Sequence, residues 1–403
     1  MPLAKGSSLQ NSLQSSAELS HGAAHVPFSK IRAIAEMAMK MEGVYPLYFG
    51  ESNQPTPDFI KEAVAQALRD NYTYYTSNAG LLSLREAIAR HYAERQGVTL
   101  NPASRILATS SGVQALNVSI RCCVDPGDEA ILLTPAWPNA SAMTAMIGAK
   151  PVELAQPLSG NRFTIDLDAI QAALTPRTKL LVVTSPSNPL GWVATVEEQK
   201  MLLDFARRHG LWLLADEVYE RLSWKSDIAP SFLQIAEPDD ALIVVQSFSK
   251  SYCMTGWRLG WVVGREDLIQ KATQLQEFIV SCPPGFVQKA GETALRDGES
   301  FIAGLRAQLL GNRDYCLQQL AGLPGISVPD AEGAFYLFPK IEGLRDSFSL
   351  AQRILEETKV GVAPGVAFGP GGEGSIRICY AADRQILEPA MTRLRAFLAA
   401  GIQ

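Results

Sequence analysis

A lysine flanked by hydroxyl side chains is the first residue of this chain whose surroundings suggest chemistry. Lys250 closes the segment Ser247-Phe248-Ser249-Lys250, which follows the apolar residues 241–245, and Arg258 comes eight residues later. The apolar run predicts a buried strand, which places Lys250 close to the end of that strand. Because lysine is rarely buried, this setting indicates an amine held near an anion, with a solvated loop as the alternative.

Two further polar groups follow predicted strands. Asp216 comes directly after the apolar residues 211–215, and burying a carboxylate without a cationic partner is costly. Such an aspartate can also cap a helix or pair with an arginine. Ser111 and Gly112 open a predicted helix, where free backbone N–H groups and the helix dipole favour a phosphate. Since open α/β sheets bind ligands at the carboxyl ends of their strands, all these groups lie where a ligand is expected.

Four motifs, taken together, resemble the class I and II aminotransferases, and the resemblance runs from about residue 28 to the C-terminus. They are Pro135-Ala136-Trp137-Pro138, Asn188-Pro189-Leu190-Gly191, Ala215-Asp216-Glu217-Val218-Tyr219, and Ser247-Phe248-Ser249-Lys250 with Met254-Thr255-Gly256-Trp257-Arg258-Leu259-Gly260. The segment around Asn188 departs from the family pattern at Ser185 and Leu190.

The resemblance implies a role for each residue that faces the cofactor ring. Lys250 would form the Schiff base with pyridoxal 5'-phosphate and carry a proton to and from the substrate Cα. Asp216 would pair with the pyridine nitrogen, which makes the ring a better electron sink. Tyr219 and Asn188 would contact the phenolic oxygen. Trp137 would stack on the ring, although without the resemblance it reads as a core tryptophan.

The remaining roles concern the cofactor phosphate and the substrate. The residues expected at the phosphate are Ser111, Gly112, Val113, Ser247, Ser249 and Arg258. Tyr75 resembles a tyrosine that reaches the phosphate of the neighbouring subunit, which implies a homodimer with shared active sites. Arg377 would grip the substrate carboxylate through two parallel hydrogen bonds, the alternative being an exposed arginine on an edge strand. Asn188 would also contact the substrate, and Gly50 would let it approach the backbone.

Length and composition set the broader frame. A chain of 403 residues exceeds the usual size of a single core, so more than one domain is expected. The net charge is −5 and the chain has no run of basic residues, so the charge pattern does not indicate binding to nucleic acid or to an anionic membrane. The first 25 residues have no signal-peptide pattern. The six cysteines show no CxxC spacing and the four histidines no metal-ligand spacing, so we expect reduced thiols, a cytoplasmic protein and no metal.

The order of elements predicts an α/β fold. From residue 105 strands alternate with helices, which indicates a three-layer domain with a mainly parallel sheet and helices on both faces. We expect an N-terminal arm and helix over 1–45, a large cofactor-binding domain over 46–290 and a smaller α/β domain over 291–403.

Local signals predict some of the boundaries within this fold. A helix is expected over 29–42 and a strand over 333–339. Helix caps are expected at Thr56, Ser83 and Thr195.

The resulting hypothesis is an aminotransferase that moves an amino group from an amino acid to a 2-oxo acid. The alternatives are a pyridoxal-phosphate-dependent C–S β-lyase and a relative that has lost catalysis, the latter disfavoured because Lys250, Asp216 and Arg377 are all present.

The sequence says less about the side chain of the substrate than about the cofactor and the reaction. Relatives that prefer dicarboxylic amino acids have a second cation where this chain has Val113 or residues 277–280. The absence of both predicts that at least one substrate is neutral, unless Arg32 or Lys30 supplies the cation.

Overall fold

A seven-stranded sheet forms the centre of the larger part of the structure, a computed structural model that describes residues 19, 23 and 26–401. The strand order is β2-β10-β9-β8-β7-β3-β4, and every neighbouring pair is parallel except those that include β10. The strands are β2 (Ile106–Thr109), β3 (Glu129–Thr134), β4 (Lys150–Ala155), β7 (Thr178–Thr184), β8 (Trp212–Asp216), β9 (Leu242–Ser247) and β10 (Gly260–Gly264).

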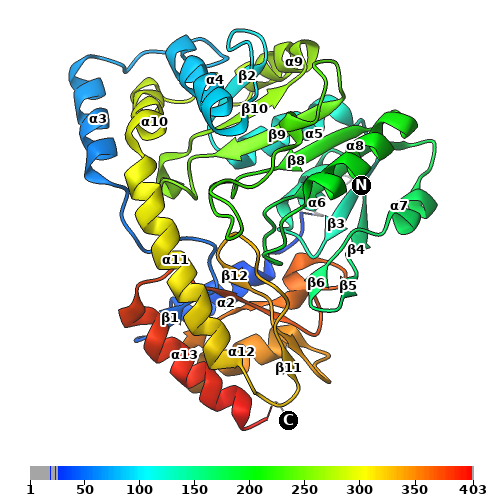
Figure 1. The fold of residues 1–403 in the computed structure, drawn as a ribbon, viewed down its shortest axis with the longest axis vertical. Coiled ribbons are helices and arrows are strands. Elements are labelled where there is room, and N and C mark those ends of the chain that lie inside the picture. Colours follow the sequence, from blue (N-terminus) through cyan, green and yellow to red (C-terminus); the bar gives the residue numbers. More distant parts are fainter. Residues whose placement is uncertain (1–18, 20–22, 24–25, 402–403) are drawn as a thin grey trace, which may run out of the picture.

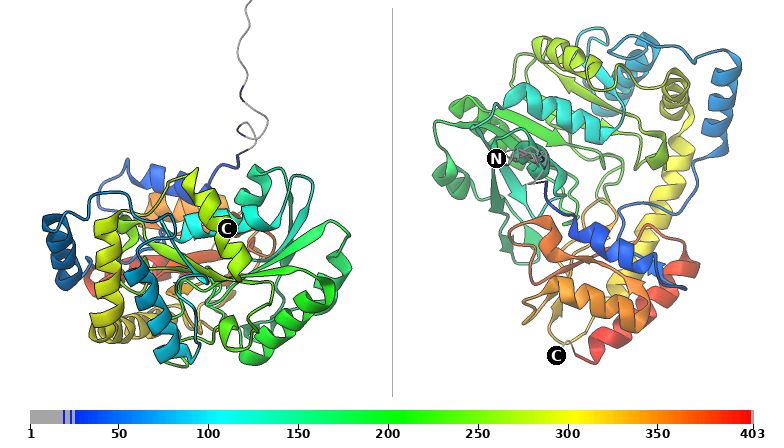
Figure 2. Two further views of the ribbon diagram at one scale, coloured as in Figure 1. Left: turned by 90° about the horizontal axis from the view of Figure 1, so that it is seen from above. Right: turned by 180° about the vertical axis from the view of Figure 1, so that it is seen from behind.

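Helices cover both faces of this sheet (Figures 1 and 2) because both faces are apolar. Along β7, Leu181 and Val183 pack into one hydrophobic cluster, whereas Leu180 and Val182 pack into another on the opposite face. This alternation follows from the pleat of a strand. The surrounding helices are α3 (Asp58–Arg69), α4 (Leu82–Gln96), α5 (Gly112–Cys123), α6 (Asn139–Met146), α7 (Leu167–Ala173), α8 (Val196–His209), α9 (Glu266–Glu277) and α10 (Gly285–Asp297). The observed layers confirm the predicted fold class.

A separate hydrophobic cluster lies in the lower part of Figure 1, around the C-terminal elements and the N-terminal helix. It is built from the helices α2 (Lys30–Ala38), α11 (Glu299–Leu320), α12 (Ser347–Thr358) and α13 (Arg384–Ala399) and from the strands β12 (Tyr336–Leu337), β14 (Val360–Gly361) and β16 (Ile376–Cys379). The strand β15 (Ala363–Pro364) pairs with β16. The helix α11 runs from the upper part to the lower part, and the expected boundary at residue 290 falls inside α10.

Short strand pairs and turns complete the described chain. They are β1 (Tyr45–Pro46) with β14 (Val360–Gly361), β5 (Leu158–Ser159) with β6 (Arg162–Phe163), β11 (Ile326–Ser327) with β13 (Lys340–Ile341), and the 3-10 turns η1 (Phe232–Gln234), η2 (Thr255–Trp257) and η3 (Gly365–Phe368). The expected N-terminal arm lies outside the described residues, apart from residues 19 and 23.

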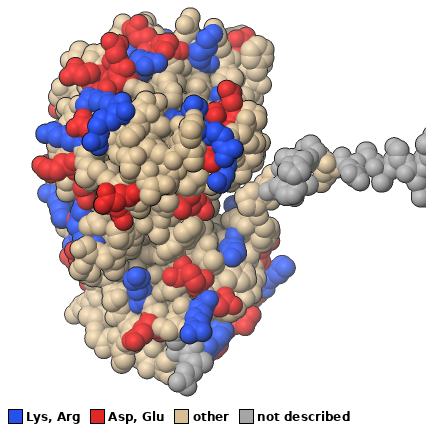
Figure 3. Space-filling view, turned by 90° about the vertical axis from the view of Figure 1, so that its right-hand side faces the viewer, with Lys and Arg blue, Asp and Glu red and all other residues tan. Residues whose placement is uncertain are grey.

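The surface carries charges of both signs. On the face in Figure 3, acidic and basic side chains are interspersed rather than separated into large patches. Within the described part of the chain, no helix has the length and apolarity that crossing a bilayer requires.

Three local predictions are corrected by tertiary contacts. Thr56 does not cap α3, because its hydroxyl donates to the carbonyl of Cys253 at 2.5 Å. Ser83 lies inside α4 rather than before it, and its hydroxyl donates to Glu292 at 2.5 Å. The third correction concerns the strand expected over 333–339, of which only β12 forms. Gly333 and Ala334 instead donate their N–H groups to the carbonyls of Gly191 and Leu222, both at 2.8 Å.

Other local predictions hold in whole or in part. Thr195 forms the predicted capping box with Glu198 at the start of α8. Ser29 caps α2 by accepting a hydrogen bond from the N–H of Arg32 at 3.2 Å, although α2 ends at Ala38 instead of residue 42.

Candidate active site

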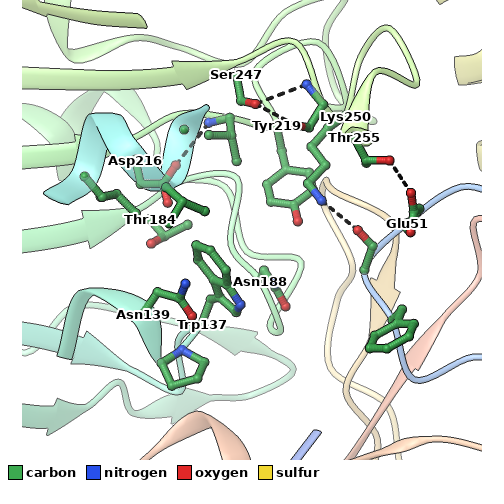
Figure 4. A pocket seen from close by; sticks show the side chains of 18 of the residues that line it. Glu51, Trp137, Asn139, Thr184, Asn188, Asp216, Tyr219, Ser247, Lys250 and Thr255 are labelled. Carbon is green, nitrogen blue, oxygen red and sulfur yellow. Dashed lines mark hydrogen bonds between the residues drawn. The ribbon is translucent and has the colours of Figure 1, made fainter. Parts of the chain in front are cut away.

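A cavity of about 670 Å³ lies at the carboxyl ends of β7, β8 and β9, and part of its wall comes from α2, β12 and β16. This is the edge at which an open α/β sheet binds ligands, and the volume suits a cofactor together with a small substrate. Figure 4 shows Trp137, Asn188 and Asp216 in the same cavity as Lys250.

Tertiary structure brings together nearly all residues that the sequence singles out. Those lining the cavity are Gly50, Gly112, Val113, Trp137, Asn188, Asp216, Tyr219, Ser247, Ser249, Lys250, Arg258 and Arg377. Ser111 lies just behind the lining, at the N-cap of α5. Tyr75 is not part of the cavity, since it lies on the surface with 89% of its area exposed.

The amine of Lys250 is the reactive group at the centre. Its Nζ donates a hydrogen bond to the Gly50 carbonyl at 2.6 Å and lies 5.8 Å from the centre of the Tyr219 ring. Burial lowers the pKa of Lys250 to about 8, and the nearby charge of Arg377 acts in the same direction, while Cys379, Glu51 and Asp216 oppose them. An amine with this pKa is partly unprotonated near neutral pH, which allows it to act as a nucleophile or a base.

Asp216 is the last residue of β8 and has only 6% of its surface exposed. Its Oδ1 accepts a hydrogen bond from the Val218 N–H at 3.3 Å, and among the described residues the carboxylate has no ion-pair partner. Burial raises the pKa of Asp216 to about 6, against the lowering effects of the Val218 hydrogen bond and the Lys250 charge. A buried carboxylate that faces a cavity in this way is suited to a cationic ligand group.

Replacing Asp216 with asparagine is expected to stabilise the cofactor-free protein. A folded pKa of about 6 against 3.8 means that the folded state binds more protons between about pH 4 and 6, so stability falls as pH rises. Above that window the cost is about 3 kcal/mol at 1.36 kcal/mol per pKa unit. The amide side chain of the variant keeps an acceptor for the Val218 N–H without the charge. We therefore expect a higher melting temperature at pH 7.5 and no difference from wild type below pH 4.

Thermal unfolding of the cofactor-free proteins from about pH 3 to 8 measures this effect. Glu94→Gln, at an exposed position on α4, is the matched control and should follow the wild-type profile. An Asp216→Asn profile parallel to that of wild type would mean that the folded state bears no cost for ionising Asp216.

The N-terminus of α5 has the features of an anion site. The hydroxyl of Ser111 caps the helix by accepting from the N–H of Gln114 at 3.1 Å, which leaves the N–H groups of Gly112 and Val113 without intrahelical partners. Ser111 adopts a φ of 129°, a region that favours glycine, and such strain is typical of functional sites. The helix dipole adds positive potential at this point.

Side chains from the end of β9 and from the segment that follows it complete this site. Ser247 and Ser249 are joined by a hydrogen bond of 2.9 Å between their hydroxyl groups. Arg258 lines the cavity, donates to the Thr255 carbonyl at 2.6 Å, and forms no ion pair with any residue that the structure describes. Gly260 allows the close approach of β10 to α5, because a Cβ there would lie 2.6 Å from the Gly112 nitrogen.

Arg377 lies on β16 with only 2% of its surface exposed, so it is not an edge-strand surface residue. Its guanidinium donates to Asn188 Oδ1 at 2.9 Å and to the Tyr48 carbonyl. Its Nε is buried and has no hydrogen-bond partner among the described residues. Since a guanidinium only donates, the Asn188 amide must present its oxygen to Arg377, which leaves Asn188 Nδ2 available to a ligand. The arrangement suits a carboxylate.

Tyr336 is a functional candidate that the sequence did not reveal. Its hydroxyl is 2.7 Å from that of Tyr219, and its ring centre is 4.5 Å from the Arg377 guanidinium. A Cβ at position 50 would collide with the Tyr336 hydroxyl, which explains why glycine stands there. The apolar residues around Tyr336 made it look like ordinary core, and only its hydroxyl could have signalled a polar contact.

The donor set fits pyridoxal phosphate, the cofactor expected from the sequence. The site combines an amine of lowered pKa, a buried carboxylate without an ion-pair partner among the described residues, and an anion site with an equally unpaired arginine. The amine can react with the cofactor's aldehyde, the carboxylate can pair with its pyridine nitrogen, and the anion site can hold its phosphate.

Comparison with known proteins agrees with this chemistry. The family profile "Aminotransferase class I and II" matches residues 43–394. The aromatic-amino-acid aminotransferase 2 of Thermococcus litoralis is 33% identical, covering 92% of this chain and 95% of that protein. The aspartate aminotransferase of Pyrococcus horikoshii is 34% identical, covering 92% and 94%. The crystal structure of the Thermus thermophilus aspartate aminotransferase with maleate has a TM-score of 0.88 and 32% identity over 94% of this chain and 99% of that one. The chain therefore belongs to the class I and II aminotransferases and is a pyridoxal-phosphate-dependent transaminase.

Proposed function

We propose that the cavity residues divide the transamination chemistry among them as their positions suggest. Lys250 would hold the cofactor covalently and Asp216 its ring nitrogen. The N-terminus of α5, Ser247, Ser249 and Arg258 would hold its phosphate. When bound, pyridoxal phosphate supplies an aldehyde that reacts with amines and a ring that accepts electrons. The observation that carries this proposal is the Lys250 amine, of lowered pKa, in one cavity with a buried carboxylate and an anion site.

Four further residues would orient the cofactor and the substrate. Asn188 Nδ2 and the Tyr219 hydroxyl would contact the phenolic oxygen, and Trp137 would lie against the ring. Arg377 would bind the α-carboxylate through its unpaired Nε and a remaining N–H. With the carboxylate held there, the Lys250 amine can take a proton from the substrate Cα in one half-reaction and return one in the other.

A panel of amino donors tests the proposal. The holoenzyme is mixed with one amino acid at a time, the cofactor absorbance is followed, and the oxo acid released is measured. Stoichiometric oxo acid, with the amino group retained on the enzyme until a second oxo acid is added, is the expected result. Release of a thiol from a sulfur amino acid, without amino transfer, would favour the C–S lyase alternative.

We also propose a homodimer with shared active sites. Two neighbouring segments of the larger sheet domain expose apolar side chains. Thr76 follows the first segment and donates its N–H to Cys282, which follows the second, at 3.4 Å. The exposed side chains, called the apolar patch, are Tyr72, Tyr74, Tyr75, Phe278, Ile279 and Val280. Phe278 has 86% and Tyr74 79% of its surface exposed, which is unusual for a monomer. A second copy of the chain would cover the patch and bring its Tyr75 to the phosphate site.

Replacing Phe278 with Glu is expected to separate the subunits, because a charge would be buried without a partner. We expect the dimer dissociation constant to rise at least ~100-fold, a typical loss when the centre of an interface is altered. Sedimentation velocity measures the mass, and cofactor affinity should fall in parallel. Met39→Glu, at a position 66% exposed on the other part of the chain, is the control and should remain dimeric. A monomeric wild-type protein with full activity would contradict the proposal.

The domain boundaries and the location remain parts of the proposal. Most members of the second hydrophobic cluster lie in α2 and after residue 304, which supports a large domain over 46–290 and a small domain over 291–403 that packs with the helix of segment 1–45. The six free cysteines, none of them paired in a disulfide, support a cytoplasmic location.

A further inference from the structure

The Tyr336 side chain lies between two residues to which different tasks are assigned. Its hydroxyl is 2.7 Å from the Tyr219 hydroxyl, and its ring centre is 4.5 Å from the Arg377 guanidinium. The strand register explains this position. Tyr336 on β12 lies opposite Cys379 on β16, and Arg377 precedes Cys379 by two residues, which puts all three side chains on one face. Tyr336 therefore contacts both the cofactor side and the substrate side of the site.

The ring and the hydroxyl of Tyr336 serve different partners. The ring is one of two that contact the Arg377 guanidinium, the other being Phe368 with its centre at 5.0 Å. Such cation–π contacts help to hold the guanidinium in place. The hydroxyl makes its only hydrogen bond within the described part of the chain to Tyr219. A change that removes only the hydroxyl therefore leaves the contact with Arg377 intact.

The direction of the hydrogen bond between the two tyrosines follows from the number of hydrogens available. A tyrosine hydroxyl donates one hydrogen and can also accept one. Burial raises the pKa of both Tyr219 and Tyr336, so both stay protonated near neutral pH. If Tyr219 donates to the phenolic oxygen of the cofactor, it has no hydrogen left for Tyr336. Tyr336 is then the donor between them, and donation by Tyr219 becomes stronger because hydrogen bonds in a chain polarise one another.

We propose that Tyr336 is a positioning residue, which donates its hydroxyl hydrogen to Tyr219 and thereby directs the Tyr219 hydroxyl toward the phenolic oxygen of the cofactor. The inference rests on the proposed contact of Tyr219 with that oxygen. A donated hydrogen bond favours the charged form of a phenolic oxygen, so the two tyrosines together lower the pH at which the bound cofactor changes its absorbance.

A pH titration of the cofactor absorbance in the holoenzyme tests this role. Tyr219→Phe should raise the midpoint by at least about 1 pH unit, the effect of losing a hydrogen bond to a charged group. Tyr336→Phe should raise it by about 0.5 pH unit, because Tyr219 remains but loses its donor. The doubly substituted protein should titrate as Tyr219→Phe does. In Tyr336→Phe, binding of propanoate should stay within about twofold of wild type, because the ring beside Arg377 is kept.

Tyr92→Phe is the matched control. Tyr92 is buried, its hydroxyl accepts a hydrogen bond from Trp261 Nε1 at 3.2 Å, and it does not line the cavity. This variant also loses a buried hydroxyl, but it should keep the wild-type midpoint.

The outcomes separate this inference from the proposed function. A shift in Tyr219→Phe without one in Tyr336→Phe would overturn the role of Tyr336 and leave the proposed function standing. A Tyr336→Phe shift that persists in the doubly substituted protein would do the same, because Tyr336 would then not act through Tyr219. If Tyr219→Phe titrates as wild type does, the proposed contact of Tyr219 with the cofactor is wrong, and the role of Tyr336 is overturned with it.

Discussion

Lys250→Ala is expected to abolish turnover, with a fall in kcat of at least ~10⁴-fold, the upper part of the range for loss of a general acid–base group. The reason is that the same amine is proposed to hold the cofactor and to move the proton at the substrate Cα. The anion site at α5 is untouched by the change, so the variant should still retain the cofactor through its phosphate. Steady-state rates and the cofactor content after dialysis measure the two effects.

Two further variants show which property of Lys250 the reaction requires. Lys250→Arg keeps a positive charge but cannot release its proton near neutral pH, so it should be as inactive as Lys250→Ala. Lys271→Ala, at an exposed position on α9, should retain full activity. Substantial turnover by Lys250→Arg would show that charge, rather than a free amine, is what the reaction requires.

Arg377→Lys is expected to weaken amino-acid binding by ~2–5 kcal/mol, the cost of breaking a buried pair between charged groups. A lysine supplies one point charge in place of the planar guanidinium, so the two-point grip is lost. The hydrogen bonds to Asn188 and to the Tyr48 carbonyl would also be disturbed. Titration of the holoenzyme with a slowly reacting amino acid measures the dissociation constant directly.

The Asn188→Ala variant separates the direct effect of Arg377 from its effect on its neighbour. Loss of the amide leaves the guanidinium in place, so binding of a carboxylate should fall less than in Arg377→Lys, while the cofactor absorbance should change more. Unchanged amino-acid affinity in Arg377→Lys would mean that the substrate carboxylate binds elsewhere.

The central features of fold and chemistry could be predicted because they depend on patterns close together in the chain. The apolar runs before Asp216 and Lys250 become β8 and β9, and both polar residues lie at the carboxyl ends of those strands. Parallel strands with helices between them bring such ends to one edge of a sheet, whatever the loops do. The capping box at Thr195 also forms as predicted, since it involves only neighbouring residues.

What the sequence could not determine depends on contacts between distant segments. Threonine is a common helix N-cap, but the Thr56 hydroxyl donates a hydrogen bond to the carbonyl of Cys253, almost two hundred residues away. Tyr336 has apolar neighbours like any core residue, and only packing places its hydroxyl beside Tyr219.

The sequence by itself therefore determined the family and the layered α/β fold, and all of its candidate site residues except Ser111 and Tyr75 line the cavity. The tertiary structure alone decided which polar groups are already satisfied within the protein and which face the cavity unpaired. It shows Asp216 and Arg258 without ion-pair partners among the described residues, and it brings Arg32 to the wall that carries Arg377 and Lys250. Local pattern cannot supply this information, because the free energy of a polar group depends on its desolvation and on partners that only the folded chain provides.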